Sequence, residues 1–323
     1  MDQGYPRLLG DIGGTNARWA WQESAAAPLQ DISVIPCQAS ASLYDSAANY
    51  LAATGHGRPQ CVGIGIATAV TGDVVRMTNN PWVFSIAQFK QSLGIHRCLV
   101  INDFTALAMS LPALTQSDLR PVGAGVPIEG EPIALLGPGT GLGVSGLILT
   151  GKGQYIALSG EGGHATLAAV DDQEAALLSL LRARFGHVSA ERVLSGPGLV
   201  DLYRAVCELD GQVAQSLSPA DVTDAAMTGT DQECVKTAHL FTSFLGNVAG
   251  NLTLTLGARG GLYIGGGIVP LLGDAFNAAL FRQRFEEKGR FKDYLSTIPT
   301  WIITASTPAL VGASRALDVL PAE

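Results

Sequence analysis

The sequence is poor in charged residues, and it lacks any dense run of lysine and arginine. Asp, Glu, Lys and Arg together make up 15% of the 323 residues. Because proteins that bind nucleic acid usually carry a basic patch, we expect no nucleic-acid partner. The formal net charge of -8 does not exclude an anionic ligand, since backbone amides and a metal ion can meet phosphate groups without a basic surface.

Cysteine is also scarce, and the few cysteines are isolated from one another. They are Cys37, Cys61, Cys98, Cys207 and Cys234. Their odd number and the absence of a CxxC pair argue against a disulfide framework and against a zinc site. The first residues also lack a basic segment followed by an apolar one, so we expect no signal peptide. The sequence therefore predicts reduced thiols, a cytoplasmic location and no zinc.

One uncharged stretch, from Ile133 to Gly151, is long enough to span a bilayer. Its many glycines, together with Pro138 and several Ser and Thr residues, instead predict a strand, a turn and a second strand. We therefore expect no membrane-spanning segment.

The chain is longer than one hydrophobic core usually serves, so two domains are expected. Apolar periodicity and turn residues predict strands near 8–10, 17–21, 61–68, 98–101, 133–136, 144–149, 154–158, 261–264 and 301–304. A strand at 74–77 is expected to pair with the one at 61–68. Helices are predicted at 42–53, 85–93, 102–110, 174–185, 198–209, 221–227, 232–256 and 308–317. This interleaving predicts an α/β protein with mixed sheets.

Two glycine-rich turns are candidate phosphate-binding sites. In the first, Gly13 and Gly14 let backbone amides approach phosphate oxygens, Thr15 adds a hydroxyl, and Asp11 is placed to hold Mg²⁺ through water. The alternative is a plain hairpin turn with Asp as a turn former. The second turn, Gly139-Thr140-Gly141, repeats the pattern. A strand follows it where a dinucleotide fingerprint requires a helix, and no P-loop sequence occurs.

Four further motifs offer groups for chemistry or binding. Asp103 follows a strand and is either a helix N-cap or a general base facing a cleft, with Asn102 placed to bind a neighbouring hydroxyl. Glu161 and His164 lie in a glycine-rich loop and suit a polyol. The bare sequence favours a short capped helix around Glu191, ended by Gly and Pro. The turn 265–267 either accommodates an adenine ring or is only a tight turn.

Together these motifs resemble those of a known superfamily. The DxGGT hairpin, the NDF helix start, the GxGTGLG hairpin and the late GGG turn resemble the ATPase core shared by actin and the hexokinases. With GEGGH at 160–164 and HVSAERVLSGPGLVDLYRA at 187–205, the sequence is similar to the bacterial glucokinases of the hexokinase-type group. The resemblance also includes TNNPWVFSI at 78–86 and FEEKGRFKDYL at 285–295. The cysteine-rich zinc motif of the ROK sugar kinases is absent.

The resemblance implies a two-domain actin-like ATPase fold, of the ribonuclease-H-like type, with an interdomain cleft. The small domain would comprise 1–112 plus 305–323, and the large domain 113–304. The resemblance also implies a homodimer.

The resemblance further implies ATP and Mg²⁺ as cofactors and phosphorylation of glucose at its 6-hydroxyl to glucose 6-phosphate, the first step of glycolysis. By matching positions, Asp103 would be the catalytic base, and the sugar ligands would be Asn102, Glu161, His164 and Glu191. The nucleotide would contact Gly10, Asp11, Ile12, Gly13, Gly14, Thr15, Gly139, Thr140, Gly141 and Gly266. Three alternatives stay open: another hexose, another phosphoryl donor such as polyphosphate, and a non-catalytic member of the fold.

Overall fold

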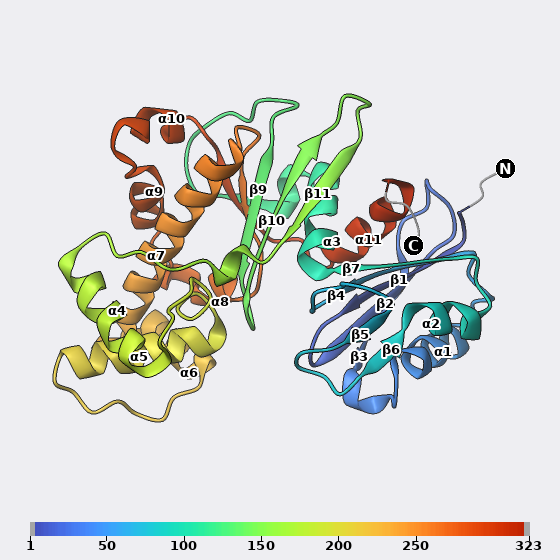
Figure 1. Ribbon diagram of the computed structural model, residues 1–323, viewed down its shortest axis with the longest axis horizontal. Helices are drawn as coiled ribbons and strands as arrows, with labels where there is room; N and C mark the ends of the chain where they lie inside the picture. Colours follow the sequence, from blue (N-terminus) through green and yellow to red (C-terminus); the bar gives the residue numbers. More distant parts are fainter. Residues whose placement is uncertain (1–3, 320–323) are drawn as a thin grey trace. The chain divides into compact units, whose positions relative to one another are not determined.

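The computed structural model describes residues 4–319, which form two compact units (Figure 1). The first unit contains the described residues up to 115, residues 149–159 and those from 305 onward. The second contains residues 116–148 and 160–304.

The first unit is built on a mixed sheet with the strand order β3-β2-β1-β4-β7. These strands are β1 (Arg7–Ile12), β2 (Asn16–Gln22), β3 (Gln30–Pro36), β4 (Cys61–Ile66) and β7 (Arg97–Asn102). The first three form an antiparallel meander, whereas β4 runs parallel to both β1 and β7. The expected hairpin around the DxGGT turn is confirmed.

Among the described residues of the first unit there are four α-helices: α1 (Leu43–Thr54), α2 (Ile86–Leu93), α3 (Asp103–Ser110) and α11 (Pro308–Val319). Ser42 and Ser85 cap α1 and α2 by accepting hydrogen bonds from backbone amides, as expected for Ser at these positions. Helix α11 packs on α3 and on strands β1 and β4. Arg7 of β1 stabilises the position of α11, because its Nη1 donates to the Ser314 carbonyl over 2.8 Å and its guanidinium pairs with Asp318.

The pairing expected for residues 74–77 is wrong. Strand β5 (Val74–Arg76) pairs with β6 (Val83–Ser85) in a small antiparallel sheet of its own. The reason lies in β4, whose two edges are already occupied by the parallel neighbours β1 and β7. A third partner therefore has no free edge to pair with.

The second sheet has the strand order β11-β10-β9-β12-β13-β8. Its strands are β8 (Leu119–Pro121), β9 (Ile133–Pro138), β10 (Leu142–Leu149), β11 (Tyr155–Gly160), β12 (Leu262–Ile264) and β13 (Thr300–Ile303). Strand β12 is parallel to β9 and β13, whereas β10 is antiparallel to β9 and β8 is antiparallel to β13. The uncharged stretch 133–151 thus forms a strand, a turn and a second strand, as predicted.

The second unit is rich in helices, with α7 at their centre (Figure 1). They are α4 (Asp172–Phe185), α5 (Gly196–Leu209), α6 (Pro219–Thr228), α7 (Gln232–Leu256), α8 (Ile268–Leu272), α9 (Ala278–Glu286) and α10 (Lys292–Ser296). A Cβ at Gly246 of α7 would lie 2.5 Å from the Phe281 carbonyl oxygen of α9. At Gly250 it would lie 2.4 Å from that of Phe285. The close helix packing predicted from these glycines is therefore confirmed.

The short helix expected around Glu191 is wrong. Residues 191–195 form turns, and the helix begins only at Gly196, with Ser195 as its N-cap and Pro197 in its first turn. Proline fits the start of a helix because its missing N–H would have no partner there. The Gly and Pro that looked like a helix end therefore mark a helix start.

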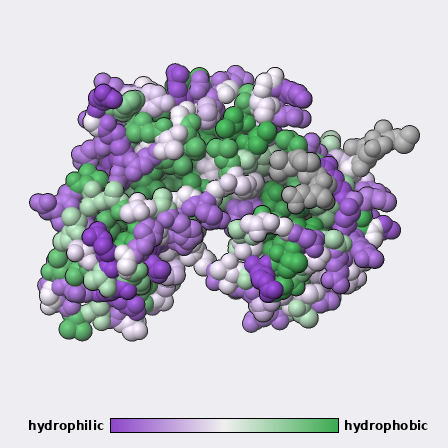
Figure 2. Space-filling model, viewed as in Figure 1, coloured by the Kyte–Doolittle hydropathy of each residue, from purple (hydrophilic) through white to green (hydrophobic). Residues whose placement is uncertain are grey.

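Short 3₁₀ turns complete the secondary structure. They are η1 (Cys37–Ala39), η2 (Leu111–Ala113), η3 (Gln116–Asp118), η4 (Gly162–His164), η5 (Gly273–Ala275) and η6 (Gly289–Phe291). Figure 2 shows polar residues spread over the visible face and interspersed with apolar ones. Between residues 4 and 319, no helix combines the length and apolarity that crossing a membrane requires.

Candidate active site

A backbone hydrogen bond closes the turn between β1 and β2. The Gly13 amide donates to the Asn16 carbonyl over 2.9 Å, so this amide is used within the turn. A Cβ at Gly14 would lie 2.8 Å from the Cβ of Asn79. Gly14 therefore lets the chain around Asn79 pack directly against the turn, which leaves no room for a larger residue.

Cys37 supports the same turn. Its amide donates to the Thr15 carbonyl over 2.8 Å, and its thiol lies 3.5 Å from the Gly13 carbonyl. The side chain is buried, and burial raises the pKa of the thiol. Cys37 is therefore a neutral hydrogen-bonding support for the turn at physiological pH.

Asp11 lies near the end of β1, just before the turn. Its Oδ2 accepts a hydrogen bond from Arg18 on β2 over 3.1 Å. Burial raises the pKa of Asp11, and the adjacent Arg18 guanidinium opposes that shift. Ile12 is completely buried, and its carbonyl accepts a hydrogen bond from the Ala67 amide over 2.9 Å, so it supports the strand end beneath the turn. A Cβ at Gly10 would lie 2.8 Å from the Trp19 ring, which explains this glycine by packing alone.

The helix cap at the start of α3 is Asn102. Its Oδ1 accepts from the amides of Phe104 over 2.9 Å and Thr105 over 3.3 Å, and its Nδ2 donates to the Thr68 carbonyl over 3.4 Å. Asp103 therefore occupies the first turn of the helix, with its Oδ1 2.9 Å from the Phe104 amide. The sequence predicts that Asp103 is either the N-cap or a general base, and the N-cap is Asn102.

Small residues let α3 approach the sheet closely. A Cβ at Gly65, the register partner of Asp11 on β4, would lie 2.9 Å from the Ala106 Cβ and 3.5 Å from the Asp103 Cα. A Cβ at Gly312 of α11 would lie 1.6 Å from the Ala106 carbonyl oxygen. Gly65 and Gly312 thus fix the depth at which Asp103 sits above the carboxyl ends of the strands.

In the second unit, the Gly139–Gly141 turn meets the start of a helix. The Gly139 amide donates to the Gly141 carbonyl over 2.8 Å, and the Gly139 carbonyl accepts from the Gly196 amide over 2.8 Å. Gly196 is the first residue of α5, whose N-cap is Ser195. Because a helix N-terminus carries partial positive charge, this arrangement favours an anion at the turn.

The late glycine turn packs on the same region. Gly266 has a φ of 78°, and a Cβ there would lie 2.3 Å from the Pro138 carbonyl oxygen. The Gly265 amide donates to the Leu136 carbonyl over 2.8 Å. Turn 265–267 therefore lies against the second glycine-rich turn, which the sequence alone did not reveal.

The GEGGH segment folds onto the beginning of β10. The His164 amide donates to the Glu161 carbonyl over 3.0 Å, which closes the η4 turn. A Cβ at Gly163 would lie 2.1 Å from the Leu142 carbonyl oxygen. The side chain of His164 is 60% exposed and Glu161 is also exposed, so both are accessible to a ligand.

Glu191 joins the two parts of this site. Its Oε2 accepts a hydrogen bond from the Leu142 amide over 2.8 Å, and its Oε1 lies 3.9 Å from the His164 Nδ1. A Cβ at Gly141 would lie 2.4 Å from the same Oε2, so Gly141 must be glycine for this contact to form. Sequence reasoning missed this bond, which spans 49 positions and leaves no local pattern.

The predicted site residues therefore gather in two groups. In the first unit, Asp11 lies near the end of β1 and Asp103 directly follows β7, with the Asp103 Cα packed over Gly65, the register partner of Asp11 on β4. In the second unit, Gly266 packs against the turn formed by Gly139–Gly141. Glu191 links this turn to His164, which lies in the same loop as Glu161.

Comparison with known proteins gives a consistent result. The family model described as Glucokinase matches residues 8–319. A glucokinase of Aromatoleum aromaticum is 51% identical over 97% of this chain and 95% of its own. One from Chromobacterium violaceum is 48% identical over 98% and 90%. The crystal structure of a glucokinase from an Antarctic psychrotroph is 37% identical, with a TM-score of 0.88 over 98% of this chain and 99% of that one.

Proposed function

Because this chain belongs to the glucokinase family, we propose that it transfers the γ-phosphoryl group of ATP to the 6-hydroxyl of glucose. One structural observation carries the proposal beyond family membership. In the second unit, the hydroxyl-binding side chains of His164 and Glu191 are joined through one hydrogen bond to a glycine-rich turn at a helix N-terminus. Groups suited to a sugar and groups suited to phosphate thus belong to one connected structure.

Asp103 is the proposed catalytic base. A carboxylate within hydrogen-bond reach of the sugar hydroxyl orients it and accepts its proton as the oxygen attacks phosphorus. The position in the first turn of α3 supports this role, because Asn102 already provides the cap. The packing at Gly65 and Gly312 holds the base on a rigid element, which fixes its position relative to the strand ends.

The proposed sugar ligands offer both donors and acceptors. Glu161 and Glu191 accept hydrogen bonds from hydroxyls, and His164 donates or accepts according to its tautomer. Since Glu191 Oε2 binds the Leu142 amide, Oε1 is the atom we assign to the sugar. Asn102 contributes through Nδ2, because its Oδ1 serves the helix cap.

The two glycine-rich turns are the proposed phosphate sites. In the first, Gly14 and Thr15 contribute directly, since the Gly13 amide is used inside the turn. Gly10 and Ile12 shape this site through the backbone only. In the second turn, Thr140 and Gly141 face the phosphates together with the start of α5. Gly266, which is exposed beside this turn, is the proposed backbone contact of the nucleotide.

Asp11 fits a role in holding Mg²⁺. It is a mostly buried carboxylate whose one described charge partner, Arg18, is itself partly exposed. Mg²⁺ in kinases keeps several waters and is bound through few carboxylates and the substrate phosphates, which agrees with a single Asp. When bound, the ion neutralises charge on the phosphate oxygens. Chelation should abolish turnover, and Mg²⁺ rather than zinc should restore it.

The proposed setting is the first step of glycolysis in the cytoplasm, with a second copy of the chain as partner. The five cysteines are all buried and free, which is compatible with a reducing compartment. Sedimentation analysis of the purified protein tests the dimer directly, since a monomer at micromolar concentration would refute it.

A panel of hexoses assayed with MgATP by coupled detection of ADP tests the activity. Glucose-dependent ADP release is expected, with glucose preferred over mannose, fructose and glucosamine. ADP release with another hexose in place of glucose would show a different sugar specificity. Turnover only with polyphosphate would identify polyphosphate as the phosphoryl donor. ATP binding without sugar-dependent release would identify a non-catalytic member of the fold.

A further inference from the structure

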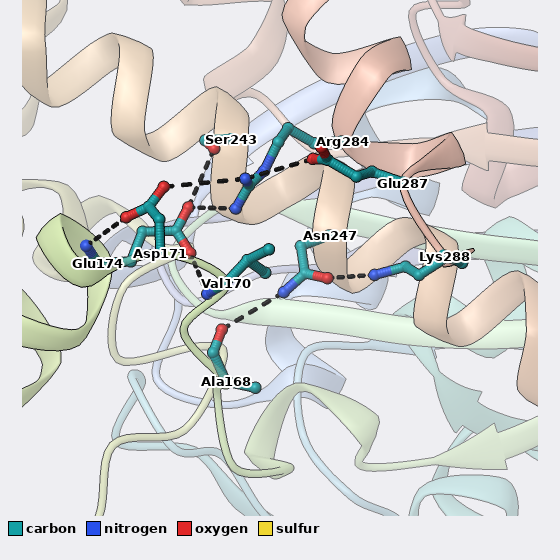
Figure 3. A network of polar contacts seen from close by, with 9 residues as sticks. All are labelled: Ala168, Val170, Asp171, Glu174, Ser243, Asn247, Arg284, Glu287 and Lys288. Atoms are coloured by element: carbon teal, nitrogen blue, oxygen red, sulfur yellow. Dashed lines mark hydrogen bonds and ion pairs between the residues drawn. The ribbon is translucent and has the colours of Figure 1, made fainter. Parts of the chain in front are cut away.

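A network of polar contacts lies in the second unit, among residues that follow the GEGGH segment and residues of three helices (Figure 3). Its centre is Glu174 of α4, which is completely buried, together with Arg284 of α9. Glu174 Oε1 accepts hydrogen bonds from Arg284 Nη2 and, over 3.1 Å, from Ser243 of α7. A second pair, Asn247 of α7 and Lys288, completes the network.

The network is bonded to the backbone of residues 165–171, the connecting segment between the η4 turn and α4. Glu174 Oε2 accepts from the Val170 amide over 2.8 Å, and Asn247 Nδ2 donates to the Ala168 carbonyl over 3.3 Å. Asp171 caps α4 at the Glu174 amide over 2.8 Å and lies 3.9 Å from Arg284. The connecting segment is therefore held from its buried side by side chains of three helices.

The other side of the connecting segment is bonded to the residues that carry Glu191. The Leu167 amide donates to the Val188 carbonyl over 3.0 Å, and the Ala190 amide donates to the Ala165 carbonyl over 2.9 Å. The Glu191 amide donates to the Gly163 carbonyl over 2.8 Å. A shift of the connecting segment would consequently move His164, which directly precedes it, and Glu191.

Stability alone does not explain this network. A buried ion pair costs desolvation of both charges, and apolar residues of similar volume often serve a core equally well. The feature that apolar residues would not supply is partners for the Val170 amide and the Ala168 carbonyl. The carboxylate of Glu174 is therefore accounted for by the backbone amide that it binds, and Arg284 balances the buried charge of Glu174.

We propose that Glu174, Asn247 and Arg284 are positioning residues that fix the sugar-binding groups of His164 and Glu191 through the connecting segment. This inference rests on the proposed function, since it assigns those two residues to the sugar. The network acts on the sugar-binding groups directly and on the nucleotide turn indirectly, through the hydrogen bond between Glu191 and Leu142, so loosening it weakens sugar binding more than nucleotide binding. None of the three touches the substrate in this arrangement, and their effect is exerted through the backbone.

Two test variants and one matched control separate positioning from general stability. Asn247→Asp keeps the size and the partner of Lys288 but removes the donor to Ala168. Arg284→Met removes the charge that pairs with Glu174. The control, Arg282→Met, removes an equally buried arginine of the same helix, which pairs with Glu286 and donates to the carbonyls of residues 295, 296 and 298.

The expected result is a rise in the glucose KM of both test variants by about five- to tenfold, the effect of one lost hydrogen-bonded support. Their ATP KM should rise less than their glucose KM, because the network is linked to the nucleotide turn indirectly, through the hydrogen bond between Glu191 and Leu142. In the ligand-free proteins, hydrogen exchange at residues 163–170 should be faster. The control should lose thermal stability, but its glucose KM and its hydrogen exchange at residues 163–170 should stay as in wild type.

Unchanged glucose KM and unchanged exchange in Asn247→Asp would overturn the inference, and this variant decides the matter even if Arg284→Met fails to fold. An equal rise of the glucose KM in Arg282→Met would also overturn the inference, because a general loss of stability would then explain the effect in all three variants. A wild-type protein without glucose turnover refutes the proposed function instead, and the exchange measurement then still decides whether the network holds the connecting segment.

Discussion

The carboxylate of Glu191 accepts a hydrogen bond from the backbone amide of Leu142, over a distance of 2.8 Å. Leu142 directly follows the Gly139–Gly141 turn, whereas Glu191 lies beside His164. One side chain thus serves a proposed phosphate site with one oxygen and a proposed sugar site with the other. Its geometry makes the two sites mutually dependent within one unit of the protein.

Glu191→Ala should therefore impair the kinetics for both substrates. A hydrogen bond to a charged group contributes enough that kcat/KM should fall by ~10- to 100-fold for glucose. The ATP KM should rise as well, because the turn loses the acceptor of its Leu142 amide. Steady-state kinetics with each substrate varied in turn gives both values, and Glu208→Gln on the exposed surface of α5 serves as control. An ATP KM equal to that of wild type would show that the bond does not support the turn.

Asp103→Asn should retain the fold and lose most of the chemistry. The asparagine keeps the size and hydrogen-bonding capacity of the side chain but accepts no proton. Turnover should fall by roughly 10²–10⁴-fold, the usual contribution of a general base. Thermal unfolding should be close to wild type, since Asn102 carries the helix cap. Turnover within a few-fold of wild type would remove Asp103 from the role of base.

Gly312→Ala should force α3 and α11 apart. The added methyl would lie 1.6 Å from the Ala106 carbonyl oxygen, so the backbone must move. Such overpacking costs about 1–3 kcal/mol, and it also displaces Asp103 at the start of α3. We expect a lower melting temperature together with a reduced kcat. Gly72→Ala is the matched control, because a Cβ at this exposed glycine meets nothing within 4 Å.

The cap of α6 should make stability depend on pH at the acidic end. Hydrogen bonds from the Ser218 hydroxyl and amide lower the pKa of Asp221 below its ordinary value of 3.8. The unfolded chain then binds the proton more readily, so this contribution is present above about pH 4 and is lost as pH falls through the folded-state pKa. Asp221→Asn should abolish the effect.

The measurement for this cap is the difference in melting temperature between wild type and Asp221→Asn, followed from about pH 6 to about pH 3. The difference should shrink as the solution becomes more acidic. A difference that grows on acidification would mean that the carboxylate has the opposite shift in pKa.

The elements predicted correctly from the sequence are those set by local chemistry. The two glycine-rich hairpins and the helix 232–256 each follow from turn residues or apolar periodicity within a few positions. The expected α/β class with mixed sheets is confirmed, and the solved relative confirms the actin-like ATPase fold.

The errors arise where distant parts of the chain decide the outcome. The partner of β5 depends on which strands occupy the edges of β4, and no local pattern encodes this. The short helix expected around Glu191 is wrong because Pro197 lies in the first turn of a helix rather than at the end of one. The contact between Glu191 and Leu142 and the network around Glu174 likewise need tertiary structure to be seen.

The attachment of α11 to the first unit has a consequence for synthesis of the protein on the ribosome. Strands β1 and β4 and helix α3 are made early, but the helix that covers them is translated only after every residue of the second unit. Until then, the apolar side chains of these elements that α11 covers stay exposed. The second unit is thus complete first, so the usual order in which the N-terminal part of a nascent chain folds before the rest is reversed.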